Sequence, residues 1–419
     1  MARDLGLFGR PLLPSACTMV KSMMALLWPT SGRSHCGGGS RGPGCRSSLT
    51  ILAAVTITTS LPLVFGEQPF AKVPWAFATV RPVPRSHRRG GSDRGGAVVV
   101  SAANVIDGGG YEDNGGGGVY RPFASYAWTK LAESGLFLPE FGPGESDGGG
   151  VGTVPDDLRS NTSAARGRVD GSRVNVEVRS MRGIDGGPIR LARYALLETM
   201  DPADGREGET VCAANAIHVL NLVAFPNPEW RGCGGEPLPV LGMDLVSLPG
   251  DKHLVAIDFQ PLTPLPETEE RRVLPERYID FESLLEGLHR RHCIESDKLP
   301  WGGDIPPQAQ RYFSPRAVWT RLLGPEALGT VQGAVWSAYQ DYLDLYLELM
   351  LQAKRDTEGG PDDSHDAEEE EEAMKGALEG QRSYLEYRRA NDPARPMLKS
   401  LYGEEWTERL IEEVLFQHI

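Results

Sequence analysis

The chain contains closely spaced strand-like segments followed by helical segments, and this order restricts its fold more than any other feature. Valines alternate with polar residues from Arg173 to Met181, which is the two-residue period of a strand. Similar segments follow at 189–199, 217–225, 240–248 and 253–259. Short, turn-rich joints favour antiparallel neighbours, because parallel strands need long crossovers. Apolar residues at helical spacing mark 120–136, 276–292, 325–355, 374–390 and 404–416. We therefore expect an α+β protein whose central antiparallel sheet is covered by helices.

The first hundred residues differ in composition from the rest. They are basic, whereas the remainder is acidic within an overall net charge of −14. The apolar stretch from Leu49 to Phe65 is short for a membrane span and is typical of a signal-peptide core. A basic segment from Arg81 to Arg94 follows it. We predict a bipartite plastid presequence over residues 1–100 and a location in the plastid stroma. A membrane anchor or a misassigned start codon is the alternative.

Glycine-rich and acidic stretches divide the remaining chain. Those at 108–118 and 142–152 predict flexible connections, and neither is followed by the lysine of a phosphate-binding loop. We place a linker at 101–118 and the folded domain at 119–419. Within this domain, residues 356–372 form an acidic low-complexity run, which predicts a disordered, solvated insertion.

Composition excludes several classes of function. An acidic domain disfavours nonspecific nucleic-acid binding, which needs a cationic surface. Beyond the leader, Cys212, Cys233 and Cys293 form an odd set without Cys-x-x-Cys spacing, so neither a disulfide framework nor a zinc or iron–sulfur site is indicated. No Gly-x-Gly-x-x-Gly fingerprint follows a strand. We expect no bound metal, flavin or nicotinamide, no stable membrane association, and a monomer.

Two isolated aspartates lie in distinctive surroundings. Asp244 lies in Leu-Gly-Met-Asp-Leu-Val-Ser-Leu-Pro, and Asp392 lies in Asn-Asp-Pro, where prolines interrupt a charged helix. With the segment Ala-Ile-Asp258-Phe-Gln-Pro-Leu, these motifs resemble the ferredoxin-dependent bilin reductases, which reduce linear tetrapyrroles of the biliverdin type. The resemblance extends over residues 120–416. It implies a three-layer α/β/α sandwich that holds the bilin between the sheet and the C-terminal helices, with reduced ferredoxin as electron donor.

Proton delivery is the chemistry that these aspartates suit. Each electron added to a bilin makes the pigment more basic, and burial beside an apolar ring system raises the pKa of a carboxyl group. The strand period places Asp244 on one face with Gly242, which leaves room for a flat ligand. From the pattern alone, an aspartate that pairs with a nearby arginine is the simpler interpretation. The resemblance favours a proton donor instead.

Asp392 follows a helix, and Arg388 lies four residues before it, on the same face if the helix persists. An aspartate before a proline also ends helices without any catalytic role. The resemblance implies that both residues belong to the active site, where Arg388 binds Asp392 or a bilin propionate. For Asp258 we expect a structural hydrogen-bonding role.

Asn221 and Arg321 bear on which bilin reacts. In the members that form phycocyanobilin, a histidine stands at the position of Asn221 and a glutamate at about Ala195. Their absence here argues against that four-electron reaction. Trp301-Gly-Gly and the segment from Tyr312 to Arg321 resemble the branch that reduces the A-ring diene system of 15,16-dihydrobiliverdin to phycoerythrobilin. Arg321 binds a propionate or forms a salt bridge, and the pattern favours neither.

The predicted function is an oxidoreductase acting on CH–CH groups by proton-coupled one-electron steps. Asp244 and Asp392 are the catalytic candidates, and Asn221, Arg388 and Arg321 are the substrate-binding candidates. Alternatives within the family are the phytochromobilin-forming reaction and the reduction of biliverdin to 15,16-dihydrobiliverdin. Outside it, the alternatives are a bilin carrier or chaperone on the same fold and a plastid interaction protein that uses the acidic insertion. We also expect a basic patch for ferredoxin, with these candidates: Arg182, Arg190 and Arg193.

Overall fold

The computed structural model describes residues 118–138, 154–164, 173–200, 216–230, 237–267, 271–358 and 367–417. The predicted leader, and the linker as far as residue 117, lie outside these residues. Within the described ranges, no helix combines the length and the apolar character that crossing a membrane requires.

A seven-stranded sheet forms the centre of the domain, and its strands lie in chain order with every neighbouring pair antiparallel. The strands are β1 (Ser160–Ala164), β2 (Arg173–Arg182), β3 (Ile189–Met200), β4 (His218–Pro226), β5 (Val240–Leu248), β6 (Lys252–Gln260) and β7 (Val318–Leu323). The turn between β5 and β6 contains Gly250 and Asp251, at φ 83° and 52°. The predicted antiparallel meander is confirmed for its five strands, whereas β1 and β7 were not predicted.

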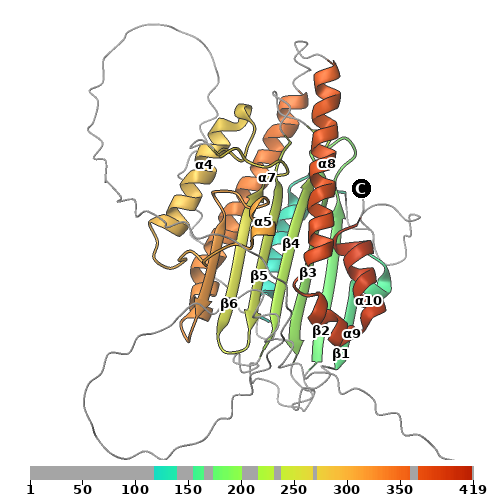
Figure 1. Ribbon diagram of the computed structural model, residues 1–419, viewed down its shortest axis with the longest axis vertical. Coiled ribbons are helices and arrows are strands. Elements are labelled where there is room, and N and C mark those ends of the chain that lie inside the picture. The colour runs from blue at the N-terminus through green and yellow to red at the C-terminus, as the bar shows by residue number, and fades with distance from the viewer. Residues whose placement is uncertain are drawn as a thin grey trace, which may run out of the picture. The chain divides into compact units, whose positions relative to one another are not determined.

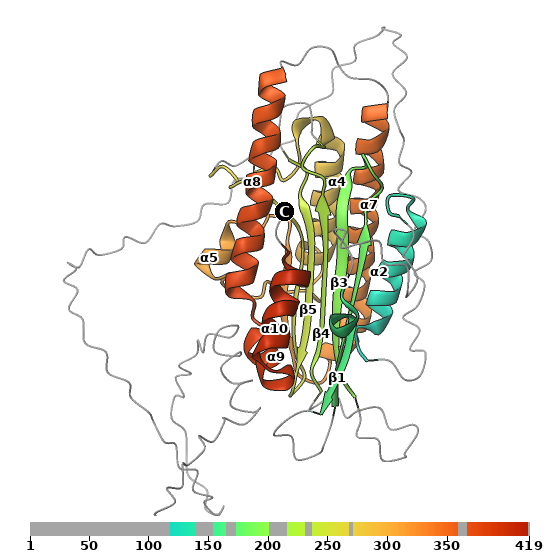
Figure 2. The same cartoon turned by 90° about the vertical axis from the view of Figure 1, so that its right-hand side faces the viewer.

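One face of the sheet is covered by a helical layer (Figure 1; Figure 2). Its helices are α2 (Arg121–Glu133), α4 (Ile279–His289), α6 (Ala327–Thr330) and α7 (Trp336–Glu358). Single helical turns flank them at Glu276–Tyr278, Arg290–Ile294 and Val331–Val335. The core beneath is rich in aromatic residues: the ring of Phe123 lies 4.8 Å from that of Trp336 and 5.1 Å from that of Tyr339, both edge to face.

The opposite face is covered by the C-terminal helices (Figure 2). These are α8 (Ala367–Asn391), α9 (Arg395–Tyr402) and α10 (Glu404–Arg409), and α10 continues as a wider helical segment, Leu410–Leu415. A second apolar core lies here, with Val223 and Val246 from the sheet and Ile411 and Phe416 from the C-terminal segment. Two short helices, α3 (Asp156–Arg159) and α5 (Pro307–Gln310), complete the described part. The expected α/β/α sandwich is therefore confirmed.

The disorder predicted over 356–372 is wrong for the two ends of this range, and residues 359–366 lie outside the described residues. Helix α7 extends through Glu358 and α8 begins at Ala367, so the range 356–372 is helical at both ends. Glutamate is a good helix former, and the acidic composition concealed this propensity. Helix α9 was not predicted either, because Pro396 was interpreted as a helix breaker. It occupies the first turn of α9, where a proline costs no hydrogen bond.

Candidate active site

A continuous row of cross-strand neighbours crosses the face of the sheet that the C-terminal helices cover. The register pairs Ala195 with Asn221, Asn221 with Asp244, and Asp244 with Ala256. Ala256 in turn pairs with Trp319 on β7. Side chains of directly paired residues lie about 5 Å apart. The row therefore places an asparagine and an aspartate side by side at the centre of the sheet, between two small alanines.

Solvent reaches the middle of this row. Ala195, Asn221 and Asp244 are all partly exposed, and the Asp244 side chain is 33% exposed. Asp244 is the residue of β5 that is not buried, since the other eight positions of the strand are. The C-terminal helices therefore leave the Asp244 carboxyl group accessible on an otherwise closed central strand.

Asp244 forms an ion pair with Arg388 of α8. Arg388 Nη1 lies 2.9 Å from Asp244 Oδ2, and Nη2 lies 3.4 Å from Oδ1. Asn221 Nδ2 also donates to Asp244 Oδ1. Burial opposes ionisation of Asp244, but the charge of Arg388 and these hydrogen bonds outweigh it and lower the pKa of the carboxyl group. The sequence pattern did not show that Arg388 lies against Asp244, and the pKa rise beside an apolar ring system stays a prediction.

Asp392 follows the last residue of α8. Its Oδ1 accepts a hydrogen bond of 2.7 Å from the Ala394 N–H, so it also organises the turn before α9. Burial raises the pKa of Asp392, and the charge of Asp244 adds to this effect, while Arg388 opposes it. The charge of Arg388 therefore acts on both carboxyl groups, and the charge of Asp244 also acts on Asp392. The pKa of Asp244 is lowered and that of Asp392 is raised.

Arg321 lies on β7 on the same face of the sheet, but two strands away from Asp244, which is about 10 Å across the sheet. Its guanidinium carbon lies 5.5 Å from the centre of the Trp319 ring. Burial lowers its pKa and the charge of Asp304 opposes this shift. The structure thus brings Asn221, Asp244, Arg388 and Asp392 together, and it places Arg321 at the end of the row rather than in this cluster.

The space over Gly242 is not open. A Cβ atom at this position would overlap the side-chain amide of Gln260, which lies across the glycine from β6. Gln260 is 4% exposed, and its Oε1 has no hydrogen-bond partner. The prediction that Gly242 leaves room for a flat ligand is therefore wrong here, because the neighbouring strand fills that room with Gln260.

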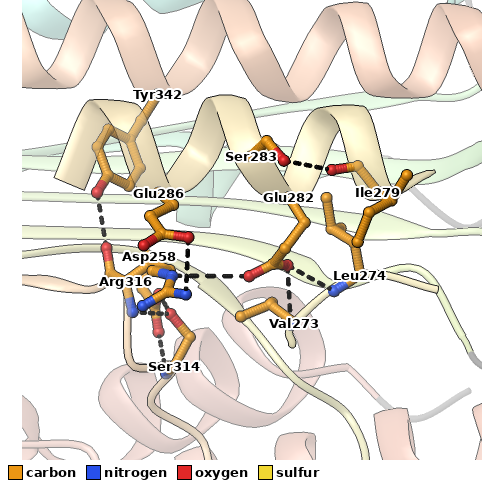
Figure 3. Close-up of polar contacts among 10 residues, drawn as sticks. All are labelled: Asp258, Val273, Leu274, Ile279, Glu282, Ser283, Glu286, Ser314, Arg316 and Tyr342. Carbon is orange, nitrogen blue, oxygen red and sulfur yellow. Dashed lines mark hydrogen bonds and ion pairs between the residues drawn. The ribbon is translucent and has the colours of Figure 1, made fainter. Parts of the chain in front are cut away.

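Asp258 lies on the same face as Asp244 but is only 1% exposed. Its Oδ2 accepts a hydrogen bond of 2.8 Å from the Ser314 N–H, and its Oδ1 accepts one from the Ser314 hydroxyl (Figure 3). Burial raises its pKa to about 7, and the hydrogen bonds from Ser314 limit this rise. Asp258 forms structural hydrogen bonds, as expected, and fixes the loop before β7.

This loop is also tied to the opposite helical layer. The Arg316 guanidinium pairs with Glu282 at 3.6 Å and with Glu286 at 3.3 Å, both on α4 (Figure 3). The Tyr342 hydroxyl of α7 donates to the Arg316 carbonyl at 2.6 Å. Sequence analysis missed these contacts, since they join segments with no shared pattern. Their effect is to hold β7, and with it Trp319 and Arg321, in place.

The expected ferredoxin patch is not supported at two of its three positions. Arg193 is 3% exposed and donates to the Leu415 carbonyl at 2.7 Å. Arg190 is partly buried, with its guanidinium 5.3 Å from the centre of the Phe225 ring. Arg182 is exposed and pairs with Asp185 at 2.7 Å. Strand residues alternate between faces, and the sequence did not reveal that the C-terminal segment covers Arg193.

The cluster brings together side chains that can hold and transfer protons. Two carboxyl groups, a guanidinium and an amide converge at an accessible point between a sheet and a helical layer. Within the residues that the structure describes, no group of three or more His, Cys, Asp or Glu side chains is arranged to hold a metal ion.

Comparison with known proteins places this arrangement in a family. Residues 207–417 match the family described as ferredoxin-dependent bilin reductase. The chain is 41% identical over 207 residues to phycoerythrobilin:ferredoxin oxidoreductase of Synechococcus sp. (strain WH8020), which covers 49% of this chain and 68% of the relative. It is 36% identical over 206 residues to the protein of the same name from Gloeobacter violaceus (strain ATCC 29082 / PCC 7421), which covers 49% of this chain and 71% of the relative.

A solved structure is also similar. This is phytochromobilin synthase from tomato in complex with biliverdin, with 23% sequence identity and a TM-score of 0.48 over 71% of this chain and 82% of that chain. The family assignment rests on the family match and on the relatives from Synechococcus and Gloeobacter. Together they show that this chain belongs to the ferredoxin-dependent bilin reductases, and that it is an oxidoreductase supplied with electrons by ferredoxin.

Proposed function

We propose that the protein reduces 15,16-dihydrobiliverdin to phycoerythrobilin at the A-ring diene system. Two electrons arrive one at a time from ferredoxin, and two protons are delivered by the carboxyl groups of the site. The observation that carries this proposal is the row Ala195–Asn221–Asp244, in which an asparagine lies beside the aspartate and an alanine lies beside the asparagine. The names of the relatives from Synechococcus and Gloeobacter support it independently.

Asp244 is ionised in the ligand-free protein, because Arg388 and Asn221 lower its pKa. An ionised carboxylate accepts hydrogen bonds, so Asp244 is suited to receive the pyrrole N–H groups of the bilin. A flat pigment over the row removes water from Asp244, and this desolvation raises its pKa. The carboxyl group then binds a proton, which it gives to the pigment once an electron has made the pigment more basic.

Asp392 has the complementary property. Burial already raises its pKa in the ligand-free protein. It is therefore the carboxyl group that more readily holds a proton before the substrate arrives, and it approaches from the helical side of the site. Arg388 balances the two, since its single charge lowers the pKa of each. Arg321, at the end of the row, is suited to bind a propionate.

The proposal is tested by an anaerobic assay with biliverdin and 15,16-dihydrobiliverdin in parallel, with ferredoxin and a reducing system. We expect dihydrobiliverdin to be converted to phycoerythrobilin and biliverdin to be a poor substrate. Efficient turnover of biliverdin alone would transfer the assignment to phytochromobilin formation or to dihydrobiliverdin formation. A carrier would shift the absorbance of the pigment without converting it, whether or not ferredoxin is present.

We also propose that the protein is located in the plastid stroma. The support is the basic, acid-poor segment behind an apolar core in the first hundred residues. Expression of residues 1–118 fused to a fluorescent protein in an alga with complex plastids tests the location, and fluorescence outside the plastid would contradict it.

A further inference from the structure

The chain segment Leu415–Phe416 is tied to the sheet beside the active site. The Leu415 carbonyl accepts a hydrogen bond of 2.7 Å from Arg193 Nη1, and Arg193 Nε donates to Ser180 Oγ at 2.9 Å. Arg193 is 3% exposed, and a buried cation is stable only where its N–H groups have such acceptors. Arg193 also lies two positions from Ala195 on the same strand, and therefore on the same face. The hydrogen bond from Arg193 therefore attaches Leu415 to the sheet next to the row that contains Asp244.

Phe416 lies at the end of this tie. Its N–H donates to the Ile411 carbonyl at 2.9 Å, which closes the last turn of the C-terminal helical segment, and the residue is 1% exposed. The guanidinium carbon of Arg388 lies 5.0 Å from the centre of its ring. This is within the range of cation–π attraction, which is strongest where water is excluded. Phe416 and Asp244 therefore contact the same guanidinium, one through a ring face and the other through a carboxylate.

We propose that Phe416 is a positioning residue for the reaction, whose ring holds the Arg388 guanidinium in the orientation that pairs with Asp244. The proposal rests on the proposed role of Asp244. An arginine side chain has several rotatable bonds, and holding it in one orientation costs entropy. The ring restricts the guanidinium from a side that the carboxylates do not occupy. Tyr384 also hydrogen-bonds to Arg388, and the charge of Asp392 acts on it. Without the ring, the guanidinium keeps these partners but is held less firmly against Asp244, whose pKa should then rise.

The matched variants are Phe416→Leu and Phe416→Met, which remove the ring but keep an apolar side chain, and Phe416→Tyr, which keeps the ring. The first readout is the ionisation of Asp244 in the ligand-free protein, followed by carbon-13 NMR of the aspartate carboxyl groups during a pH titration. Asp244→Asn identifies the signal. We expect the Leu and Met variants to titrate at higher pH than the wild type, and the Tyr variant to titrate as the wild type does.

The second readout is kcat/KM for dihydrobiliverdin as a function of pH, with the melting temperature measured for each variant. We expect the acid limb of the profile to move to higher pH in the Leu and Met variants, and turnover to fall about thirtyfold, the order of a desolvated cation–π contact. The Tyr variant should retain the wild-type profile.

The inference is overturned if the ring-free and ring-containing variants titrate alike, or if neither ring-free variant folds, since Phe416 would then serve packing alone. The NMR readout needs no substrate, so it separates this inference from the proposed function. Normal product formation by Asp244→Asn would remove the proposed proton donor and leave the NMR result unaffected.

Discussion

Arg388 pairs with Asp244 at 2.9 Å although 144 positions separate the two residues in the chain. The pair joins α8 to the central strand β5 at Asp244, the residue of this strand that solvent reaches. It sets the charge state of the site before any substrate binds, and the predictions for the two carboxyl groups follow from it.

The first prediction concerns Asp244→Asn. The amide preserves size and shape, so bilin binding should persist, but the side chain can no longer donate a proton. Turnover should fall about a hundredfold to ten-thousandfold. Electrons still arrive, so a bilin radical should accumulate, which electron paramagnetic resonance detects anaerobically. Asp251→Asn is the control, because asparagine also tolerates the positive φ of this turn residue. Near-normal product formation by Asp244→Asn would exclude it as a proton donor.

Asp392→Asn should keep the fold, because an asparagine oxygen can still accept the hydrogen bond from Ala394. It removes the carboxyl group whose pKa burial raises. We expect turnover to stall at an absorbing species different from that of Asp244→Asn, since the proton is delivered from the helical side. Rapid-scan spectroscopy under anaerobic conditions compares the two. Identical intermediates in both variants would show that the carboxyl groups do not deliver separate protons.

The protein should lose stability as the pH falls below about 6.5. Burial lowers the pKa of His218 and of His253 to about 4 each, and both residues are 5% exposed. Unfolded histidines bind protons more readily, so each contributes stability that is present above the unfolded pKa and lost as the pH falls through the folded one. The slope is about 1.4 kcal/mol per pH unit for each histidine.

Urea unfolding at several pH values between about 4 and 7 measures this loss. His253→Gln should lower the slope by about 1.4 kcal/mol per pH unit. A free energy of unfolding that does not change with pH in this interval would contradict the buried, neutral state of the pair.

Asp258→Asn should change the pH dependence of stability in the opposite sense. Burial raises the pKa of Asp258 to about 7, so its favourable contribution is present below the unfolded pKa and is lost as the pH rises through the folded one. Asparagine can hydrogen-bond to both Ser314 groups without ionising. Relative to the wild type, the variant should therefore gain stability as the pH rises from about 4 to 7. A constant difference between the two proteins would show that Asp258 does not titrate in this interval.

The fold could be predicted where the periodicity was local. The alternation of valines in β2 and the Pro249–Lys252 turn between β5 and β6 located the meander. Strand β7 was missed because it follows a long helical region and pairs with β6. Helix α9 was missed because a proline in a first turn has the same sequence appearance as a helix breaker.

The candidate site was identified residue by residue, but its electrostatics were not. Asp244 and Arg388 were both selected, yet their pairing depends on how α8 crosses the sheet. The local pattern placed Arg388 beside Asp392, four positions away, and did not show that the charge of Arg388 lowers the pKa of Asp244. Gln260 and Phe416 were missed as neighbours of the site for the same reason. Gln260 contacts Gly242 from the neighbouring strand, and Phe416 contacts Arg388 from the C-terminal segment. Residue spacing within one element cannot show contacts between elements.

The cross-strand row has a consequence for engineering. Asn221 and Ala256 lie directly beside Asp244 on one face of the sheet, and Ala195 lies beside Asn221, while the other face forms a separate apolar core. Replacements at these three positions alter the surroundings of Asp244 and leave the core on the other face untouched, whereas Ala256 also belongs to the apolar core beneath the C-terminal helices. A small combinatorial library at these positions, screened by the colour of the pigment that colonies accumulate, would therefore sample new reaction outcomes on an unchanged scaffold.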